Sequence, residues 1–190
     1  MRRLFTALTL PEKISESLSL MAPETHGIRP VPEEALHLTL RFIGEVEQQR
    51  VAEVEECLAQ VEAPILKLKL RGVGVFPEGK NPRVLFAGVE ENRELVELKK
   101  KIDRELSSLG FENDTRAYHP HVTLARLSHP LPEGTAEKII SFLKEAGSFE
   151  SEPFICDEFV LFQSRLHEDG ARYSVEGNYR LGNLTDFLLN

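Results

Sequence analysis

Hydrophobic and polar residues alternate along several segments of the chain. This pattern is typical of half-buried strands, because successive side chains of a strand point to opposite faces. The clearest example runs from Leu66 to Arg71, where leucines alternate with lysine or arginine. By alternation and β-prone composition, we predict strands at Leu4–Leu10, Leu36–Ile43, Ile65–Val75, Arg83–Val89, Phe154–Gln163 and Tyr173–Leu181. A turn at Glu168–Asp169–Gly170 is predicted to pair the last two strands.

Apolar residues recur at helical spacing in the stretches between these strands. The stripe from Leu95 to Leu109 is followed by Gly110, which suits the C-terminal cap of a helix. Pro11 fits the first turn of another helix. We therefore predict helices at Glu12–Met21, Glu47–Val61, Leu95–Leu109 and Glu133–Ala146, and a loop at Phe76–Pro82 from its Gly and Pro content.

Two segments carry copies of one four-residue pattern, His-apolar-Thr-apolar. They are His37-Leu38-Thr39-Leu40 and His121-Val122-Thr123-Leu124. In a strand, His and Thr two positions apart share one face, and the apolar residues point to the other. Two such histidines in one cleft can supply one general base and one general acid. The alternative, a structural strand histidine with satisfied hydrogen bonds, is the usual interpretation of a lone His, and the second copy disfavours it.

The two halves of the chain repeat the same order of elements. A strand near Phe5 or Leu85 is followed by a helix, then by a His-x-Thr strand, then by another helix and strand. The intervals from the first strand to the motif histidine are 32 and 36 residues, and the two histidines are 84 positions apart. Two related lobes that face each other would bring both His-Thr pairs into one cleft.

Composition sets bounds on the class of protein. The chain has 190 residues, 41% hydrophobic and 28% charged, as is ordinary for a soluble globular protein. Its net charge of −8 argues against broad, nonspecific nucleic-acid binding, but it allows a local basic pocket for one phosphate. Cys57 and Cys156 are isolated and carry no CxxC spacing, which indicates buried or half-buried thiols in a reducing compartment. With no signal peptide and no membrane-length apolar stretch, we expect a cytoplasmic protein.

The blocks around both motifs resemble the 2H phosphoesterase superfamily, which is named for two His-x-Thr/Ser motifs. Within it, the chain is similar to the RNA 2′,3′-cyclic phosphodiesterases, also called 2′-5′ RNA ligase-like proteins. The resemblance covers nearly the whole chain. The blocks that carry it are Arg3-Leu4-Phe5-Thr6-Ala7-Leu8, Leu36-His37-Leu38-Thr39-Leu40-Arg41-Phe42-Ile43-Gly44-Glu45, Gly74-Val75-Phe76-Pro77, Pro82-Arg83-Val84-Leu85 and His119-Pro120-His121-Val122-Thr123-Leu124-Ala125-Arg126.

This resemblance implies a bilobal α+β fold over residues 1–190. The single domain would have two intertwined, pseudo-symmetric lobes, each an antiparallel sheet with outer helices. It implies hydrolysis of a 2′,3′-cyclic phosphate at an RNA end or on a nucleotide to a 2′-phosphomonoester, without metal, cofactor or obligate protein partner. The family has also been linked to RNA 2′-5′ ligation. By the same match, His37 is the proton donor and His121 the proton acceptor, while Thr39, Thr123 and Arg126 bind the phosphate oxygens.

Three residues leave open questions. Strict alternation from His121 places Arg126 on the opposite face of the strand. If Arg126 binds the phosphate, a bulge or strand end near Ala125 must bring its side chain to the face of His121. Arg41 shares the face of His37 by alternation, and it is either a cleft residue or a solvated edge charge. Phe76 either stacks on a base or packs within its loop, and loop packing is favoured.

Two rival functions compete with acid–base hydrolysis. A metallohydrolase could use His37 and His121 as ligands, but neither strand carries a third ligand beside its motif. A non-catalytic module could bind a nucleotide or RNA end in the same cleft, but it would need neither histidine to titrate. The other histidines, His26, His119, His129 and His167, lack the His-x-Thr context, although His119 is placed to shape the site.

Overall fold

The computed structural model describes residues 1–79, 81–113, 115–167 and 170–182. Its strands are β1 Arg2–Thr9, β2 Ile28–Pro30, β3 His37–Val46, β4 Leu66–Leu68, β5 Leu70–Phe76, β6 Val84–Val89, β7 His121–Leu127, β8 Phe154–Cys156, β9 Glu158–His167 and β10 Gly170–Arg180. Its α-helices are α1 Glu12–Ser19, α2 Val51–Leu58, α3 Arg93–Ser108 and α4 Thr135–Glu145. The α+β fold predicted from the sequence is confirmed.

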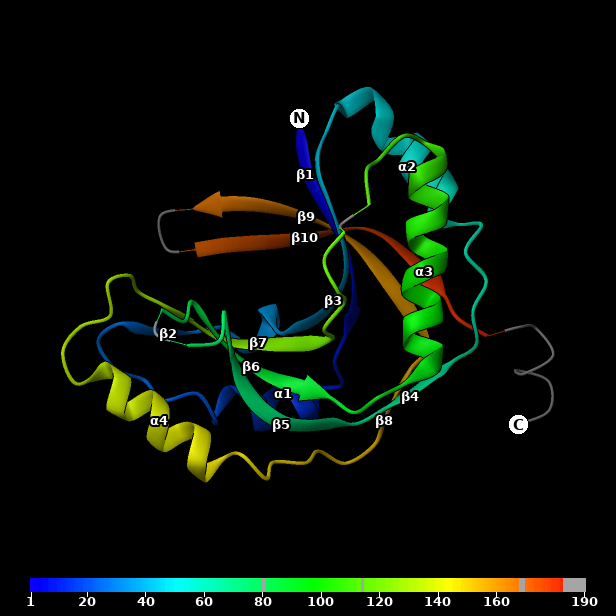
Figure 1. Ribbon diagram of the computed structural model, residues 1–190. Helices are drawn as coiled ribbons and strands as arrows, with labels where there is room; N and C mark the ends of the chain where they lie inside the picture. Colours follow the sequence, from blue (N-terminus) through cyan, green and yellow to red (C-terminus); the bar gives the residue numbers. More distant parts are fainter. Residues whose placement is uncertain (80, 114, 168–169, 183–190) are drawn as a thin grey trace.

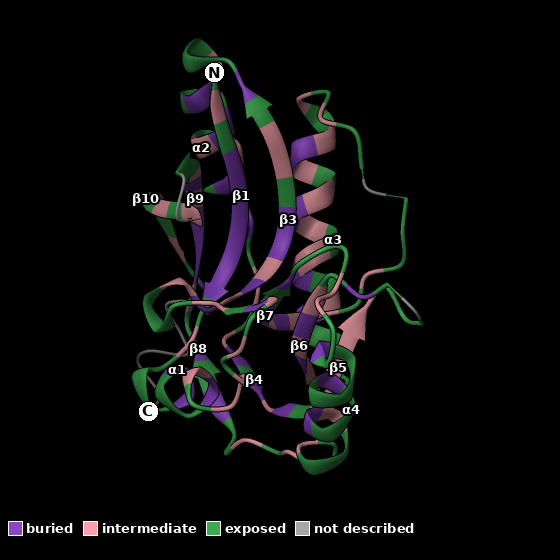
Figure 2. Cartoon of the chain, turned by 90° about the vertical axis from the view of Figure 1, so that its left-hand side faces the viewer, coloured by how far each residue is buried: buried purple, intermediate pink, exposed green. Residues whose placement is uncertain are grey.

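Eight of the strands form one antiparallel sheet, whose two halves meet at a single residue pair. The strand order is β10-β9-β1-β3-β7-β6-β5, and β2 pairs with β7 beside this path. β3 and β7 are joined only at Leu38 and Val122. The halves β10-β9-β1-β3 and β7-β6-β5 with β2 correspond to the predicted lobes, but their sheets are continuous rather than separate. Helices α2 and α3 lie together on one side of the molecule, and α1 and α4 lie near the half that contains β5 (Figures 1 and 2).

The order of elements repeats in the two halves as the sequence predicts. β1 pairs with β3 after the intervening helix α1, and β6 pairs with β7 after the intervening helix α3. Both pairs are antiparallel. Each His-x-Thr strand is therefore held by the strand that precedes it in its own half.

The core lies between the large sheet and the helices (Figure 2). Leu38 and Val122, the pair that joins the halves, are both fully buried, as are Leu95 and Ile102 of the apolar stripe of α3. Asn92 caps this helix, because its side chain accepts a hydrogen bond of 2.8 Å from the backbone N–H of Leu95. Burial of the predicted stripe confirms that core packing explains it.

Two strands predicted as continuous are each divided in two. Ile65–Val75 forms β4 and β5, and Phe154–Gln163 forms β8 and β9. β4 and β8 leave the large sheet and pair with each other as a two-stranded sheet. Alternation cannot reveal such a division, because buried residues still alternate through the break, at Leu66, Leu68 and Leu70.

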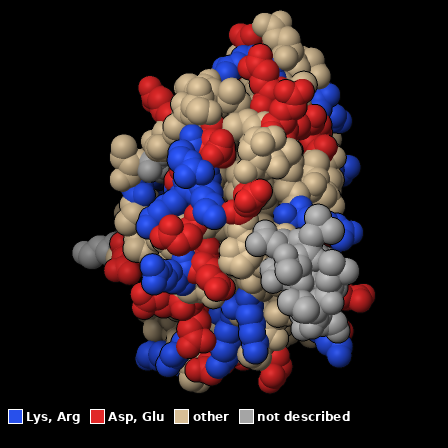
Figure 3. Space-filling view, turned by 90° about the vertical axis from the view of Figure 1, so that its right-hand side faces the viewer, with Lys and Arg blue, Asp and Glu red and all other residues tan. Residues whose placement is uncertain are grey.

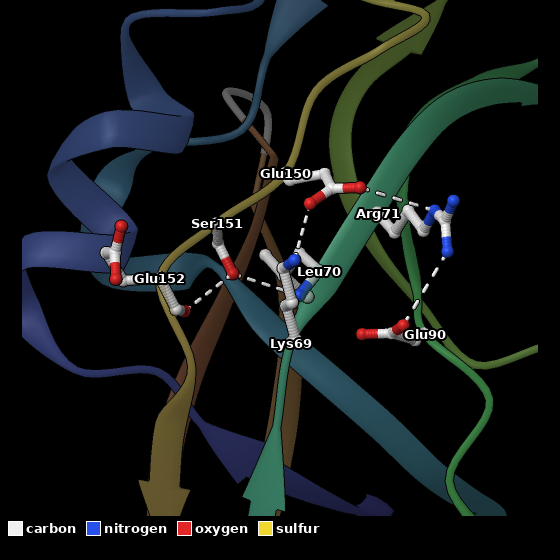
Figure 4. Close-up of polar contacts among 7 residues, drawn as sticks. All are labelled: Lys69, Leu70, Arg71, Glu90, Glu150, Ser151 and Glu152. Atoms are coloured by element: carbon white, nitrogen blue, oxygen red, sulfur yellow. Dashed lines mark hydrogen bonds and ion pairs between the residues drawn. The ribbon is translucent and has the colours of Figure 1, made fainter.

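Polar contacts hold the chain before β8 against the edge of β5 (Figure 4). Lys69 Nζ lies 2.5 Å from Glu150 Oε2, and Arg71 Nε lies 3.5 Å from Glu150 Oε1. The backbone N–H of Leu70 donates to Ser151 Oγ at 2.9 Å. The edge of the sheet is thus covered by a chain segment at this point, which protects it from pairing with another molecule.

Other differences are small. The strand Ile28–Pro30 was not predicted, because three residues between glycine and prolines give no readable alternation. Glu168 and Asp169 of the predicted turn lie outside the described residues, although β9 and β10 pair as predicted. Cys57 is half-buried and Cys156 is buried. Across the described part of the chain, no helix is long and apolar enough to cross a membrane.

Candidate active site

Both His-x-Thr pairs lie where the two halves of the sheet meet. His37 and Thr39 on β3 and His121 and Thr123 on β7 are half-buried, whereas Leu38 between the first pair is fully buried. All four polar residues line one cleft of about 650 Å³. The structure therefore brings the two predicted pairs together, with the alternation that the sequence indicates.

The two histidine rings are anchored in the same way. His37 Nδ1 lies 2.7 Å from the backbone oxygen of Ala35, and His121 Nδ1 lies 2.7 Å from that of His119. A carbonyl oxygen can only accept a hydrogen bond, so Nδ1 carries the proton in both rings. In the neutral ring, Nε2 is then unprotonated and can accept a proton, and in the protonated ring the same nitrogen can release one. His119 shapes the site through its main chain.

Aromatic side chains surround His37. The centroid of its ring lies 5.0 Å from that of Phe5 on β1 and 5.2 Å from that of Tyr173 on β10. These rings exclude water from the imidazole while leaving it on the wall of the cleft. Three strands of one half of the sheet thus build the environment of this histidine.

His121 has a matching environment in the other half. Its ring centroid lies 5.4 Å from that of Phe86 on β6 and 5.1 Å from that of Phe76 at the end of β5. Phe76 stacks on Phe86 at 4.2 Å, with 15° between the ring planes. Phe76 thus packs behind the histidine as favoured from the sequence, although it ends a strand rather than lying in a loop.

Burial lowers the pKa of both histidines. For His37, burial acts most strongly, and the positive charges of Arg126 and His121 lower its pKa further, against the hydrogen bond to Ala35. For His121, burial again acts most strongly, and His119 adds to the lowering. Both rings therefore favour the neutral form in the free protein, and each can exchange its proton in the pH range below 6.5.

A bulge in β7 places Arg126 in the cleft. Leu85 and Phe86 are consecutive on β6, but their partners on β7 are Ala125 and Thr123, so one residue of β7 is extra. The extra residue shifts the alternation by one. Arg126 is exposed and lines the same cleft as Thr123, as the predicted bulge requires.

The same bulge occurs in β3. Thr6 and Ala7 are consecutive on β1, but they pair with Arg41 and Thr39. The shift sends Phe42 into the cleft at the position that Arg126 occupies in the other half, five residues after the motif histidine. It also turns Arg41 away from the cleft.

Both sequence interpretations of Arg41 are therefore wrong. The side chain is 4% exposed, so it is neither a cleft residue nor a solvated edge charge. Its Nη1 lies 3.4 Å from Asp103 Oδ1 on α3, and its Nη2 donates to the backbone oxygen of Glu112. Asp103 also pairs with Lys99. Arg41 joins the sheet to α3 and to the chain that leads to β7.

Several cleft residues were not predicted. Phe42 is 67% exposed and Leu166 is 74% exposed, and both line the cleft with Tyr173, Arg3 and Arg29. The position of Phe42 could have been found by placing one motif on the other, because Arg126 has the same offset from its histidine. The others come from segments whose place beside the motifs is set only by the fold.

No metal-binding cluster occurs among the residues that the structure describes. No three His, Cys, Asp or Glu side chains there gather closely enough to hold an ion. A protein metal site usually has three or four such ligands. The donor set around His37 and His121 is suited instead to proton transfer, with hydroxyl and guanidinium groups for an anion.

The chain is similar to known phosphoesterases in both sequence and fold. A family model described as LigT-like phosphoesterase matches residues 8–86 and 88–173. An RNA 2′,3′-cyclic phosphodiesterase of Aeropyrum pernix is 36% identical over 149 residues, which are 77% of this chain and 82% of that protein. A protein of the same name from Methanocaldococcus jannaschii is 33% identical over 177 residues, or 91% of this chain and 97% of the relative.

Solved structures share the fold over almost the whole chain. TT0787 of Thermus thermophilus superimposes with a TM-score of 0.76 and 28% identity, covering 97% of this chain and 100% of that one. E. coli LigT in complex with 3′-AMP gives a TM-score of 0.76 and 26% identity, covering 96% of this chain and 99% of that one.

Proposed function

Since the chain belongs to the LigT-like phosphoesterase family, we propose that it is an RNA 2′,3′-cyclic phosphodiesterase that opens the cyclic phosphate to a 2′-phosphomonoester. The observation that carries this proposal is the pair of identically anchored histidines on the walls of one cleft. The names of the relatives support hydrolysis over a module that only binds RNA ends.

In the proposed reaction, His121 accepts a proton from water while the water oxygen forms a bond to phosphorus. The bond from phosphorus to the ribose O3′ breaks, and His37 donates its proton to that oxygen. The phosphate remains on O2′. One proton enters at His121 and one leaves from His37, so the site returns to its starting state after a proton moves between the rings through solvent.

The negative charge that develops on phosphate oxygens needs donors that are already in place. We assign this role to the hydroxyls of Thr39 and Thr123 and to the guanidinium of Arg126. Each of the three lines the cleft with the histidines. Exposed Phe42 lines the same cleft, and its aromatic face suits a nucleobase. The same groups could serve 2′-5′ ligation, in which the 5′-hydroxyl of a second RNA end replaces water: its proton goes to His121, its oxygen bonds to phosphorus, and O3′ again leaves with the proton of His37.

Hydrolysis of an oligoribonucleotide that ends in a 2′,3′-cyclic phosphate tests the proposal. We expect a 2′-phosphomonoester, identified by phosphorus NMR, and turnover that persists in EDTA. His37→Ala and His121→Ala should each lower turnover by about 10²–10⁴-fold, the usual contribution of an acid or base. Both variants should melt close to the wild type.

The outcomes separate the candidates. Tight binding of the RNA end without turnover would favour the non-catalytic module. Loss of activity in EDTA that a divalent ion restores would contradict metal-independent acid–base catalysis. A dominant 3′-phosphate product would mean that the two histidines have exchanged roles or that the ribose lies the other way round.

A further inference from the structure

The lining of the cleft differs in charge from the rest of the protein. The chain has 31 Asp and Glu against 23 Lys and Arg. On the face that carries α2 and α3, charges of both signs are interspersed (Figure 3). The cleft, by contrast, is lined by three arginines, Arg3, Arg29 and Arg126, and by no Asp or Glu among the described residues. Positive charge thus gathers around the proposed chemistry.

Two of these arginines lie directly opposite each other. In the β2–β7 register, Arg29 is the partner of Arg126. Side chains at paired positions share a face with Cβ atoms about 5 Å apart, and like charges there are destabilising. Neither arginine has a carboxylate partner within the described part of the chain. Arg3 differs, because its partner in the β1–β3 register is Glu45. An arrangement that costs stability in the free protein points to a bound anion.

Arg126 and Arg29 stand in different relation to the reacting centre. Beyond the effect of burial, Arg126 lowers the pKa of His37, whereas Arg29 is not among the charges that act on either histidine. Arg29 extends from β2, one strand beyond Arg126 and away from β6. The two guanidinium groups thus enter the same cleft from neighbouring strands, and Arg126 is the one whose charge acts on His37.

We propose that Arg29 binds a second phosphate of the substrate, the phosphodiester on the 5′ side of the terminal nucleotide, while Arg126 holds the cyclic phosphate. A guanidinium forms two parallel hydrogen bonds to a phosphate, whose negative charge neither a ribose nor a base carries. In an RNA end, the nearest anion to the cyclic phosphate is the 5′ phosphate of the same nucleoside. The site then selects a strand end over a nucleoside cyclic phosphate. This inference rests on the proposed function for the identity of the first phosphate.

A comparison of substrates with and without the second phosphate tests the assignment. Adenosine 2′,3′-cyclic phosphate lacks it, whereas its 5′-phosphorylated form and the dinucleotide ApA 2′,3′-cyclic phosphate carry it. Arg29→Gln should lower kcat/KM about 3- to 10-fold for the two longer substrates and leave the first unchanged. The salt dependence of the longer substrates should lose roughly 0.7 in slope on a log–log plot. Arg29→Lys should recover part of the loss.

Two controls keep the result specific. Arg93→Gln changes an exposed arginine on α3 by the same charge, away from the cleft, and should affect none of the substrates. Binding is also measured without turnover, by calorimetry with adenosine 2′-phosphate and adenosine 2′,5′-bisphosphate. The wild type should bind the bisphosphate more tightly, and Arg29→Gln should bind the two ligands alike.

Each failure has its own pattern. An equal loss for all substrates would place Arg29 at the reacting phosphate and overturn the inference, as would no loss for any of them. If the wild type hydrolyses none of the substrates but the binding difference depends on Arg29, the proposed function fails and the second phosphate site stands. If that difference is unaffected by Arg29→Gln, the inference is overturned whatever the activity.

Discussion

Arg41 follows the bulge of β3 and Arg126 follows the bulge of β7. We predict that methionine at position 41 lowers stability and not activity, and that methionine at position 126 lowers activity and not stability. Arg41 is 4% exposed, pairs with Asp103 at 3.4 Å and donates to the backbone oxygen of Glu112. A hydrogen bond that involves a charged group contributes about 1.5–3 kcal/mol, and the bond from Arg41 to Glu112 is of this kind, whereas the contact with Asp103 is an ion pair without a hydrogen bond. In the variant, Asp103 loses its contact with Arg41 but keeps its pairing with Lys99. Its side chain is also 15% exposed, so water and Lys99 partly compensate the lost contact. We therefore expect Arg41→Met to cost about 2 kcal/mol of the free energy of unfolding.

For a chain of this length, about 2 kcal/mol lowers the melting temperature by roughly 4–8 °C. Hydrolysis of the cyclic phosphate should stay within about twofold of wild type well below that temperature, because Arg41 points away from the cleft. Arg126→Met should do the reverse. Removing a donor to the developing oxyanion typically costs about 10²–10³-fold in rate, whereas an exposed substitution changes stability by no more than about 0.5 kcal/mol.

The chain contains no Trp, so unfolding in urea is best followed by far-ultraviolet circular dichroism. The kcat/KM for the cyclic phosphate is measured on the same preparations. If Arg41→Met kept its stability but lost most of its activity, the claim that the β3 bulge turns Arg41 away from the cleft would be refuted. Arg126→Met that unfolds but remains active when folded would refute the assignment of that arginine to the cleft.

Two further predictions concern the histidines and the junction between the strands. The pH profile of kcat/KM reports the free enzyme and should be bell-shaped. Because burial lowers the pKa of both His37 and His121, its optimum should lie on the acid side of pH 6.5. A plateau of kcat/KM above pH 7.5 would contradict this. The Tyr118 hydroxyl donates to the backbone oxygen of Thr39 at 3.0 Å across the junction, so Tyr118→Phe should cost about 1 kcal/mol of stability and lower kcat more than it raises KM. An unchanged kcat with a raised KM would show that this hydrogen bond does not set the spacing of the two motifs.

Local pattern predicted that the two His-Thr pairs line one cleft, because their geometry is local. His and Thr two positions apart share a face in any strand, and the duplicated pattern indicated a shared cleft. Alternation fails at a bulge, however, and Arg41 was misplaced for that reason. The need for a bulge after His121 could be inferred only because Arg126 matched a family position.

Residues contributed by distant elements carry no such signal. Arg29 lies in a three-residue strand between glycine and prolines, and only the fold brings it beside Arg126. The division of Ile65–Val75 is equally invisible, because the buried residues keep the same period when the strand changes partners.

The junction at Leu38 and Val122 has a stereochemical consequence. An antiparallel pair has a local two-fold axis between its partners, so the rings of His37 and His121 approach from opposite directions. A phosphorus atom bound near that axis has one ring on each side, as its two apical positions require when the entering oxygen and the departing oxygen are in line. Such a displacement inverts the configuration at phosphorus in a single step, and no covalent bond to the protein forms. A chiral cyclic phosphorothioate that is opened in isotopically labelled water would therefore give a product of inverted configuration, and the duplication of a strand pair would be the origin of that inversion.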